Sequence, residues 1–397
     1  MMKLLFVVNN FNFGGPQKSL VNLLYELEEQ DVEVDLMIMN QQDKLSEYLP
    51  RYVNVIPLPD KYSLLMLDKN NLLSKMLKNL KKPILNIKVL LFIIKSQLKL
   101  HDNTKSKQKF WLKNKWKSNE FSGHYDYAIG VSGGHSIYFI KDYIKAENKI
   151  GWIRTDYKVL KRDNDLDQKY FEYMNGMLAV SNMTANSFNE LFGIQPFVFY
   201  NSLPIKLYEN IEEDKFNYNP NATNLCTICR LDEGKGLDLL IDAAKCLKED
   251  ELNIKWYVVG TGKLENWLHE EIHKNDLSQI VIPLGFKFNT GSILKKMDVL
   301  IHPSRFEGKS NTIDEALFYQ KPVIATNFET VYEQIEDGQN GFIVNMNGKE
   351  IAESIKNLYE NKTLYFEIKN NLENSQNSQL NKGEEFLKLI HKIGDEK

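Results

Sequence analysis

Residues 1–40, MMKLLFVVNNFNFGGPQKSLVNLLYELEEQDVEVDLMIMN, contain a complete strand, turn, helix and strand pattern. The apolar run LLFVV ends at a turn containing Gly14 and Gly15, and SLVNLLYELEEQ then repeats apolar residues at helical spacing. The segment VEVDLMIM returns to the spacing of a strand. A strand–helix–strand unit of this kind predicts a parallel sheet that binds its ligand at the carboxyl ends of the strands.

The same pattern recurs in the second half of the chain. The strand NLCTICR leads into the loop LDEGKG and the helix LDLLIDAAKCL, and the strand NIKWYVVG leads into GTG and the helix KLENWLHEEIHK. Three further strands are predicted at IVIPLG, VLIHPS and PVIATN. The polar stretch 208–223 separates the two runs. We therefore expect an α/β protein of two Rossmann-like domains, at 1–200 and 201–378, with a ligand cleft between them.

The composition narrows the classes of function. The 397 residues carry 50 Lys+Arg and 53 Asp+Glu, and a formal net charge of -3 argues against a protein that binds nucleic acid over its whole surface. Three cysteines are too few for a disulfide framework and indicate a reducing compartment. The N-terminal apolar run is too short for a signal peptide, and every other run falls short of the ~18 residues that span a bilayer. We expect a cytoplasmic protein, soluble or peripheral to the membrane.

One segment, at about 60–120, departs from the strand and helix pattern. Thirteen lysines and a single acid, Asp102, lie at 75–117, interleaved with apolar residues and with Phe110, Trp111 and Trp116. Basic, apolar and aromatic residues together predict a helix that lies on an anionic membrane surface, at ~1 kcal/mol for each basic residue near the lipid. The alternative is a solvated helical insertion.

Two cations follow a predicted strand in the loop CRLDEGKG. Arg230 offers a bidentate fork and Lys235 a point charge, which together suit a diphosphate. A lysine in such a loop is more often a solvated side chain, so the pair is a weak signal by itself. The phosphate-binding loop G-x-x-x-x-G-K-[ST] is absent, and FNFGGPQ lacks the third glycine of a dinucleotide site.

The stretch PSRFEGKSNTIDEALFYQKPVIAT (303–326) is more specific. Glu307 and Glu315 are separated by seven residues, and the loop GKSN precedes the helix that carries Glu315. Backbone amides at a helix start can bind a phosphate, and the carboxylates can accept hydrogen bonds from sugar hydroxyls. The simpler alternative is a loop glutamate followed by a glutamate that only stabilises the helix dipole.

Together, RLDEGKG and the segment from Glu307 to Glu315, followed by KPVIAT, resemble the donor site of the retaining family 4 glycosyltransferases, which have the GT-B fold and include bacterial enzymes of capsule and cell-surface polysaccharide synthesis. The resemblance is specific over 225–345, weaker over 1–40 and 177–204, and absent over 60–120. It implies that Arg230 and Lys235 bind the donor diphosphate and that Glu315 holds the ribose. It also implies that Glu307 faces the transferred sugar and that four loop residues complete the phosphate site: Gly308, Lys309, Ser310 and Asn311.

Other positions match the family more loosely. The resemblance implies that these residues lie near the nucleotide or its diphosphate, or in the interdomain link: Gly14, Gly15, Gly260, Gly262, Phe286 and Asn201. It also implies that the C-terminal helix, at 379–397, returns to the N-terminal domain. Arg154 in GWIRTDY stands where many relatives carry a histidine, so acceptor-side chemistry is assigned to Arg154 or to the fallback candidate His135 in SGGHS.

A metal-dependent alternative is the acidic segment DNDLD at 163–167. D-x-D patterns bind a divalent cation in glycosyltransferases of the other major fold, but here no apolar strand leads into the segment and Gln168 occupies the glycine position of an EF-hand. We interpret it as an acidic surface loop and expect neither a metal ion nor another cofactor.

The resemblance predicts transfer of a sugar, with retention, from a nucleotide diphosphate donor to a glycan acceptor. UDP is the expected nucleotide, and a lipid diphosphate at the inner face of the membrane is the expected carrier of the acceptor, which the N-terminal domain would bind. Two alternatives remain: a sugar-nucleotide epimerase with the same fold, and a catalytically inactive partner subunit.

Overall fold

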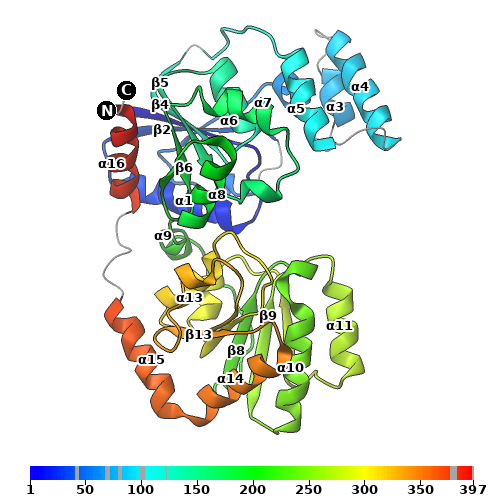
Figure 1. Cartoon of the computed structure of the whole chain (residues 1–397), viewed down its shortest axis with the longest axis vertical. Coiled ribbons are helices and arrows are strands. Elements are labelled where there is room, and N and C mark those ends of the chain that lie inside the picture. Colours follow the sequence, from blue (N-terminus) through cyan, green and yellow to red (C-terminus); the bar gives the residue numbers. More distant parts are fainter. Residues whose placement is uncertain are drawn as a thin grey trace. The chain divides into compact units, whose positions relative to one another are not determined.

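The computed structural model describes residues 1–40, 44–67, 72–78, 83–98, 103–121, 123–375 and 382–395. The chain forms two compact units, of which the first is Met1–Ser202 with Asn381–Lys397 and the second is Leu203–Leu380. The division falls five residues before the polar stretch 208–223, whose first residues belong to a short helix of the second unit. Each unit contains one parallel sheet (Figure 1).

The sheet of the first unit has seven strands in the order β3-β2-β1-β4-β5-β6-β7. The strands are β1 (Met2–Val8), β2 (Val32–Ile38), β3 (Asn54–Ile56), β4 (His124–Val131), β5 (Lys145–Ile153), β6 (Gly176–Ala179) and β7 (Phe197–Val198). The helices are α1 (Gly15–Leu27), α2 (Asp60–Leu65), α3 (Leu72–Lys78), α4 (Pro83–Gln97), α5 (Asn103–Asn114), α6 (His135–Tyr143), α7 (Asn164–Phe171), α8 (Asn182–Phe192) and α16 (Lys382–Asp395), with single 3-10 turns at η1 (Ser46–Tyr48) and η2 (Tyr157–Val159).

The sheet of the second unit has six strands in the order β10-β9-β8-β11-β12-β13. The strands are β8 (Thr223–Ile228), β9 (Ile254–Val259), β10 (Val281–Gly285), β11 (Val299–His302), β12 (Val323–Thr326) and β13 (Gly341–Val344). The helices are α9 (Ile205–Glu209), α10 (Leu237–Glu249), α11 (Glu265–Lys274), α12 (Thr290–Leu294), α13 (Asn311–Phe318), α14 (Gly348–Glu360) and α15 (Lys362–Ser375), with 3-10 turns at η3 (Glu233–Lys235) and η4 (Val331–Glu333).

The central strands are apolar along their length because helices cover both faces of each sheet. In β1 the residues from Leu4 onward are buried, and Leu4 pairs with Val34 on one side and Tyr127 on the other. In each unit the strand order reverses once, between β1 and β4 and between β8 and β11. A crevice for a ligand forms beside such a reversal, at the carboxyl ends of the strands.

The last helix, α16, packs on the first unit, where it lies beside α1 (red and blue in Figure 1). Phe386 is fully buried, and its ring centroid lies 5.7 Å from that of Phe6, 5.3 Å from Phe199 and 5.9 Å from Trp152. Gly383 is needed because a Cβ there would lie 2.8 Å from a backbone oxygen of α1. The helix therefore completes the core of the first unit.

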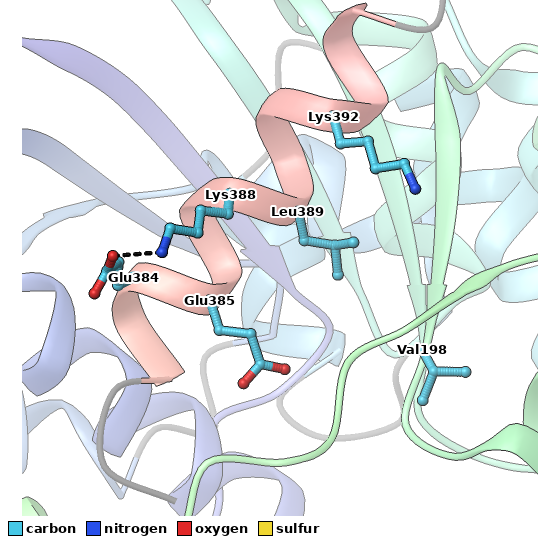
Figure 2. Close-up of a pocket in the computed structure, with 6 residues that line it drawn as sticks. All are labelled: Val198, Glu384, Glu385, Lys388, Leu389 and Lys392. Carbon is cyan, nitrogen blue, oxygen red and sulfur yellow. Dashed lines mark ion pairs between the residues drawn. The ribbon is translucent and has the colours of Figure 1, made fainter. Parts of the chain in front are cut away.

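A groove of about 420 Å³ lies between α16 and Val198 of β7 (Figure 2). Its lining carries both signs of charge, and Lys388 Nζ pairs with Glu384 at 2.6 Å. The lining residues are Val198, Glu384, Glu385, Lys388, Leu389 and Lys392, and none of them is a predicted site residue.

The described parts of the basic segment form α3, α4 and α5. They correct the expectation that its aromatic residues lie on a membrane surface. Trp111 is fully buried and Phe110 nearly so, because they pack into the core of the first unit, and Trp116 is half-buried. Phe110 and Trp111 are therefore not available to a membrane. Lys81, Lys82, Lys99 and Asp102, which contribute to the predicted patch, lie outside the described residues.

The interpretation of DNDLD as a surface loop is wrong. Asp163 caps the start of α7, and Asp167 is fully buried on that helix. Arg162 pairs with Asp167 at 2.6 Å, and Tyr157 donates a hydrogen bond to it at 2.9 Å. The partners neutralise a carboxylate that would otherwise be costly to bury, so the segment is structural.

Replacing Phe386 by Ala tests the role of α16 in the first unit. The cavity left among Phe6, Trp152 and Phe199 should destabilise the protein by about 3–5 kcal/mol. Urea denaturation followed by circular dichroism measures the change. The matched control on the same helix is Lys388→Ala, which removes an exposed side chain and should have little effect; equal stability of the two variants would contradict the packing role.

Candidate functional site

The loops that follow β8 and β11 meet at the strand-order reversal of the second unit. The loop after β8 carries Arg230 and Lys235, and the loop after β11 carries Glu307. Lys235 Nζ lies 2.6 Å from Glu307 Oε1. Two of the residues predicted for the donor site are thus in direct contact, at the place where the topology forms a crevice.

Gly236 makes this contact possible. Its φ is 65°, a left-handed conformation, and a Cβ on it would lie 1.9 Å from the backbone oxygen of Pro303. The loop after β11 therefore passes directly over Gly236, and the amide of Arg305 donates a hydrogen bond to the oxygen of Gly234 at 2.9 Å. Any side chain at 236 would separate the two loops.

Glu307 is partly buried and has three hydrogen-bonding partners on one oxygen. Besides Lys235, Ser304 Oγ donates to Oε1 at 3.0 Å and His302 Nε2 lies 3.1 Å from it. Burial raises the pKa of Glu307, but the hydrogen bond and charge of the His302 ring and the charge of Lys235 more than offset this and lower the pKa to about 2. Glu307 is therefore a carboxylate at neutral pH.

Arg230 is the exposed cation of the site, with its side chain 73% accessible and paired with Asp232. The loop that carries it is fixed from the side of β9. The amide of Leu231 donates to the oxygen of Thr261 at 3.1 Å, and a Cβ on Gly262 would meet the backbone of Leu231 at 2.4 Å. A Cβ on Gly260 would likewise lie 1.9 Å from the backbone oxygen of Cys229. The predicted glycines thus hold the loop of Arg230 in place.

The loop 308–311 leads into α13, and here the structure assigns structural contacts to two predicted ligands. Ser310 caps α13 through its hydroxyl, and its amide donates to Gln334 Oε1 at 2.9 Å. Lys309 is buried in an ion pair with Asp314, whose other oxygen accepts from Gln334 Nε2 at 2.7 Å. Gln334 therefore clamps the loop. Gly308 faces open space, and Asn311 is the first residue of α13.

Glu315 is 5% exposed, and its Oε2 accepts hydrogen bonds from Tyr208 and Thr290. Phe286, by contrast, is 45% exposed just after β10. The second unit thus contains both predicted glutamates, one beside the cations and one on α13.

Three of the predicted residues lie near the reversal of the first unit. Gly14 and Gly15 begin α1, after β1, and His135 begins α6, after β4. The His135 ring lies 5.4 Å from that of Trp111, and its Nε2 is buried without a hydrogen-bond partner in the described part of the chain. Burial, with the charges of Arg162 and Lys107, lowers the pKa of His135 to about 3. The imidazole is therefore neutral and covered.

Arg154 and Asn201 form a pair within the first unit. Arg154 Nη2 donates to Asn201 Oδ1 at 2.5 Å, and the guanidinium lies 4.5 Å above the ring of Trp152. Burial lowers the pKa of Arg154 to about 9, which leaves it charged at neutral pH. Both side chains are 8% exposed, so Arg154 fastens the segment that leads out of the first unit.

Sequence reasoning missed His302, Ser304 and Gln334. His302 ends β11, and a polar ring at the carboxyl end of a strand, five residues before Glu307, is a signal that the strand-end rule can detect. Gln334 gives no such signal, because it reaches the loop from 24 residues away. Within the described ranges, no three His, Cys, Asp or Glu side chains gather as metal ligands.

The pKa of Glu307 makes stability depend on pH. Because folding lowers this pKa from its usual value of 4.5 to about 2, the stabilisation is present above pH 4.5 and is lost as the pH falls through 2. We expect the stability advantage of the wild type over Glu307→Gln, on the order of 3 kcal/mol, to disappear over this range. Thermal unfolding at several pH values measures it; an advantage independent of pH would contradict the assignment.

Comparisons with known proteins find similarity in both the sequence and the fold of this chain. Residues 209–375 match the family model of the glycosyl transferases group 1. An uncharacterized glycosyltransferase of Methanocaldococcus jannaschii is 28% identical over 249 residues, which are 61% of this chain and 65% of that protein. The 4-alpha-N-acetylgalactosaminyltransferase of Campylobacter jejuni that acts on a diphospho-undecaprenol-linked sugar is 29% identical over 181 residues, 44% of this chain and 47% of the enzyme.

Among solved structures, a mutant of Staphylococcus aureus TarM in complex with Fondaparinux, alpha-GlcNAc-glycerol and UDP is similar over the full length of both chains, with a TM-score of 0.69 and 15% identity. The fold is GT-B, as the sequence predicted. The matched regions span about two thirds of the archaeal relative and about half of the bacterial enzyme.

Proposed function

We propose, from the match of residues 209–375 to the family model of the glycosyl transferases group 1, that the chain transfers a sugar from a nucleotide diphosphate donor to a glycan acceptor in the synthesis of a cell-surface polysaccharide or glycoconjugate. The observation that carries the proposal is the contact of Lys235 with Glu307 at the strand-order reversal, with the exposed Arg230 on the same loop as Lys235. A diphosphate suits two cations at a crevice edge, and a sugar suits an ionised carboxylate beside them.

The donor is proposed to be a UDP-sugar. The TarM structure contains UDP, and Arg230 and Lys235 would bind the diphosphate. Lys235 already pairs with Glu307, so the bound diphosphate would share this ammonium with the carboxylate. Glu307 would then face the sugar, while Glu315 would bind the ribose.

Transfer is proposed to retain the anomeric configuration, with the leaving diphosphate assisting the incoming hydroxyl on the same face of the sugar. The principal task of the protein is then to stabilise the negative charge that develops on the diphosphate. Arg230 and Lys235 supply the positive charge that opposes it, so we propose a reaction that needs no metal ion.

Two other functions use the same fold. An epimerase would release the nucleotide without an acceptor, and an inactive partner subunit would release none. A panel of nucleotide sugars, each incubated with and without a glycan acceptor and scored for free nucleotide, separates the three. Release that depends on the acceptor supports transfer.

Removing either cation tests the donor site. Arg230→Ala and Lys235→Ala should each lower kcat/KM by ~10² or more, because each removes charge stabilisation from the leaving diphosphate. Steady-state kinetics with the donor selected by the panel measure this, and Lys245→Ala on α10 is the control.

Wild-type activity should also persist in EDTA. Unchanged kinetics in both variants would refute the site, and inactivation by EDTA would refute metal independence.

The acceptor is proposed to be a glycan on a lipid diphosphate, bound by the first unit at the inner face of the cell membrane. The name of the Campylobacter jejuni relative specifies a diphospho-undecaprenol-linked sugar. None of the described helices is long and apolar enough to span a bilayer. A lipid-linked acceptor would be reached through a surface of the protein that binds the membrane.

Helix α4 offers this surface. It packs through Leu85 and Val89 and exposes aliphatic residues on its outer side. Asn86 Nδ2 donates to the oxygen of Met76 on α3, and Phe92 packs on Phe110 of α5, so the three helices form one insertion (Figure 1). The exposed aliphatic residues of the insertion are Leu77, Ile84, Ile87, Leu90, Leu91, Ile94, Leu98 and Leu112, with exposed lysines at 88 and 95.

Apolar exposure on this scale marks an interaction surface. The lysines favour an anionic membrane as its partner. We expect the protein to bind phosphatidylglycerol vesicles and to dissociate as the salt concentration rises. The reason is that salt screens the attraction of the lysines to the lipid, and the screening length of ~8 Å at physiological ionic strength falls further. The triple variant Ile87→Ser, Leu91→Ser, Ile94→Ser and the double variant Lys88→Gln, Lys95→Gln should both bind less in a flotation assay.

Val159→Ser is the matched control, since Val159 is an exposed apolar residue of the same unit outside the insertion. It should bind vesicles like the wild type, and all variants should bind UDP alike. A wild type that ignores anionic vesicles at low salt would refute the membrane surface and favour a soluble polymer as the acceptor.

A further inference from the structure

A buried cluster of hydroxyls surrounds Glu315 and is not explained by the donor contacts proposed so far. Thr290 Oγ1 donates to Glu315 Oε2 at 2.8 Å, and Tyr208 Oη donates to the same oxygen at 3.1 Å. The two hydroxyl oxygens are 2.5 Å apart. All three side chains are at most 6% exposed, so two buried hydroxyls in close contact with each other hold one oxygen of the carboxylate.

The three side chains come from three separate elements. Tyr208 lies on α9, the first helix after the chain enters the second unit, Thr290 begins α12, and Glu315 lies on α13. Asn289, the cap of α12, donates its side-chain amide to the backbone oxygen of Tyr208 at 3.2 Å. The orientation of Glu315 therefore depends on how α9 and α12 pack.

Gly291 shows that the position of the tyrosine ring is specified. A Cβ at 291 would lie 2.7 Å from Cδ2 of Tyr208 and 2.5 Å from the hydroxyl of Tyr319. Burial and the charge of Glu315 keep the pKa of Tyr208 well above its usual value, so its hydroxyl remains a donor at any physiological pH. The cluster is thus a fixed set of donors aimed at one carboxylate oxygen.

We infer that Tyr208 and Thr290 are positioning residues for the ribose of the donor, because they hold Glu315 in the orientation that its hydrogen bonds to the ribose hydroxyls require. This inference rests on the proposed function, in which Glu315 binds the ribose. A carboxylate held by two hydroxyls cannot rotate away when the nucleotide is absent, which lowers the ordering cost on binding.

Nucleotide binding tests the inference without any transfer reaction. The probes are UDP and 2′,3′-dideoxy-UDP, which lacks both ribose hydroxyls, and calorimetry measures their Kd. The wild type should prefer UDP. Tyr208→Phe and Thr290→Val each remove one hydroxyl at nearly constant volume. Each should raise the Kd for UDP about tenfold, as expected for the loss of one hydrogen bond to a charged group. Neither should change the Kd of the dideoxy analogue.

Two controls separate positioning from simple stability. Thr290→Ser keeps the hydroxyl and should restore the preference for UDP. Tyr319→Phe removes a neighbouring hydroxyl that makes no hydrogen bond to Glu315 in the described contacts, and should leave the preference unchanged. If one of the first two variants does not fold, the other still tests the inference.

The possible failures are distinguishable. If the wild type binds UDP and the dideoxy analogue equally, the ribose role of Glu315 in the proposed function is wrong, and the inference falls with it. If the wild type prefers UDP and both hydroxyl-deleted variants prefer it to the same extent, the proposed function stands and the inference alone is refuted.

Discussion

The ion pair between Lys235 and Glu307 connects the two loops on which the candidate site depends. These loops follow β8 and β11, the neighbouring strands at which the strand order reverses, and they approach each other only because Gly236 has no Cβ. The pair is partly buried, so neither charge is fully hydrated, and Lys235 stabilises the ionised form of Glu307. The contact therefore specifies both the geometry of the two loops and the charge state of Glu307.

A second constraint is common to the buried carboxylates of this chain. Glu307, Glu315 and Asp167 are each held by several donors, which include an ammonium, an imidazole, tyrosine and threonine hydroxyls and a guanidinium. A buried carboxylate without such partners would take up a proton or unfold the site. The same arrangement is structural at Asp167, and at Glu307 it keeps the carboxylate ionised in the candidate site.

The insertion of the first unit shows how one segment can serve two purposes. Its aromatic residues, Phe110 and Trp111, enter the core and attach the insertion to α6, with Trp111 covering His135. Its aliphatic residues on α4 remain exposed. The physical reason is size and position along the helices: the large rings fill the space over the sheet, and the outer side of α4 has no neighbour within the described residues of the unit.

The sequence by itself determined the two parallel sheets, since apolar strand runs alternating with helical spacing permit little else. It also predicted Arg230, Lys235 and Glu307 from strand-end loops and Glu315 from the helix that follows. Only the tertiary structure decided which polar residues are structural. Lys309 pairs with Asp314, Asp167 is buried on α7, and Tyr208 reaches Glu315 across 107 residues. Contacts between elements distant in the chain leave no local pattern, because packing, and not spacing, brings their side chains together.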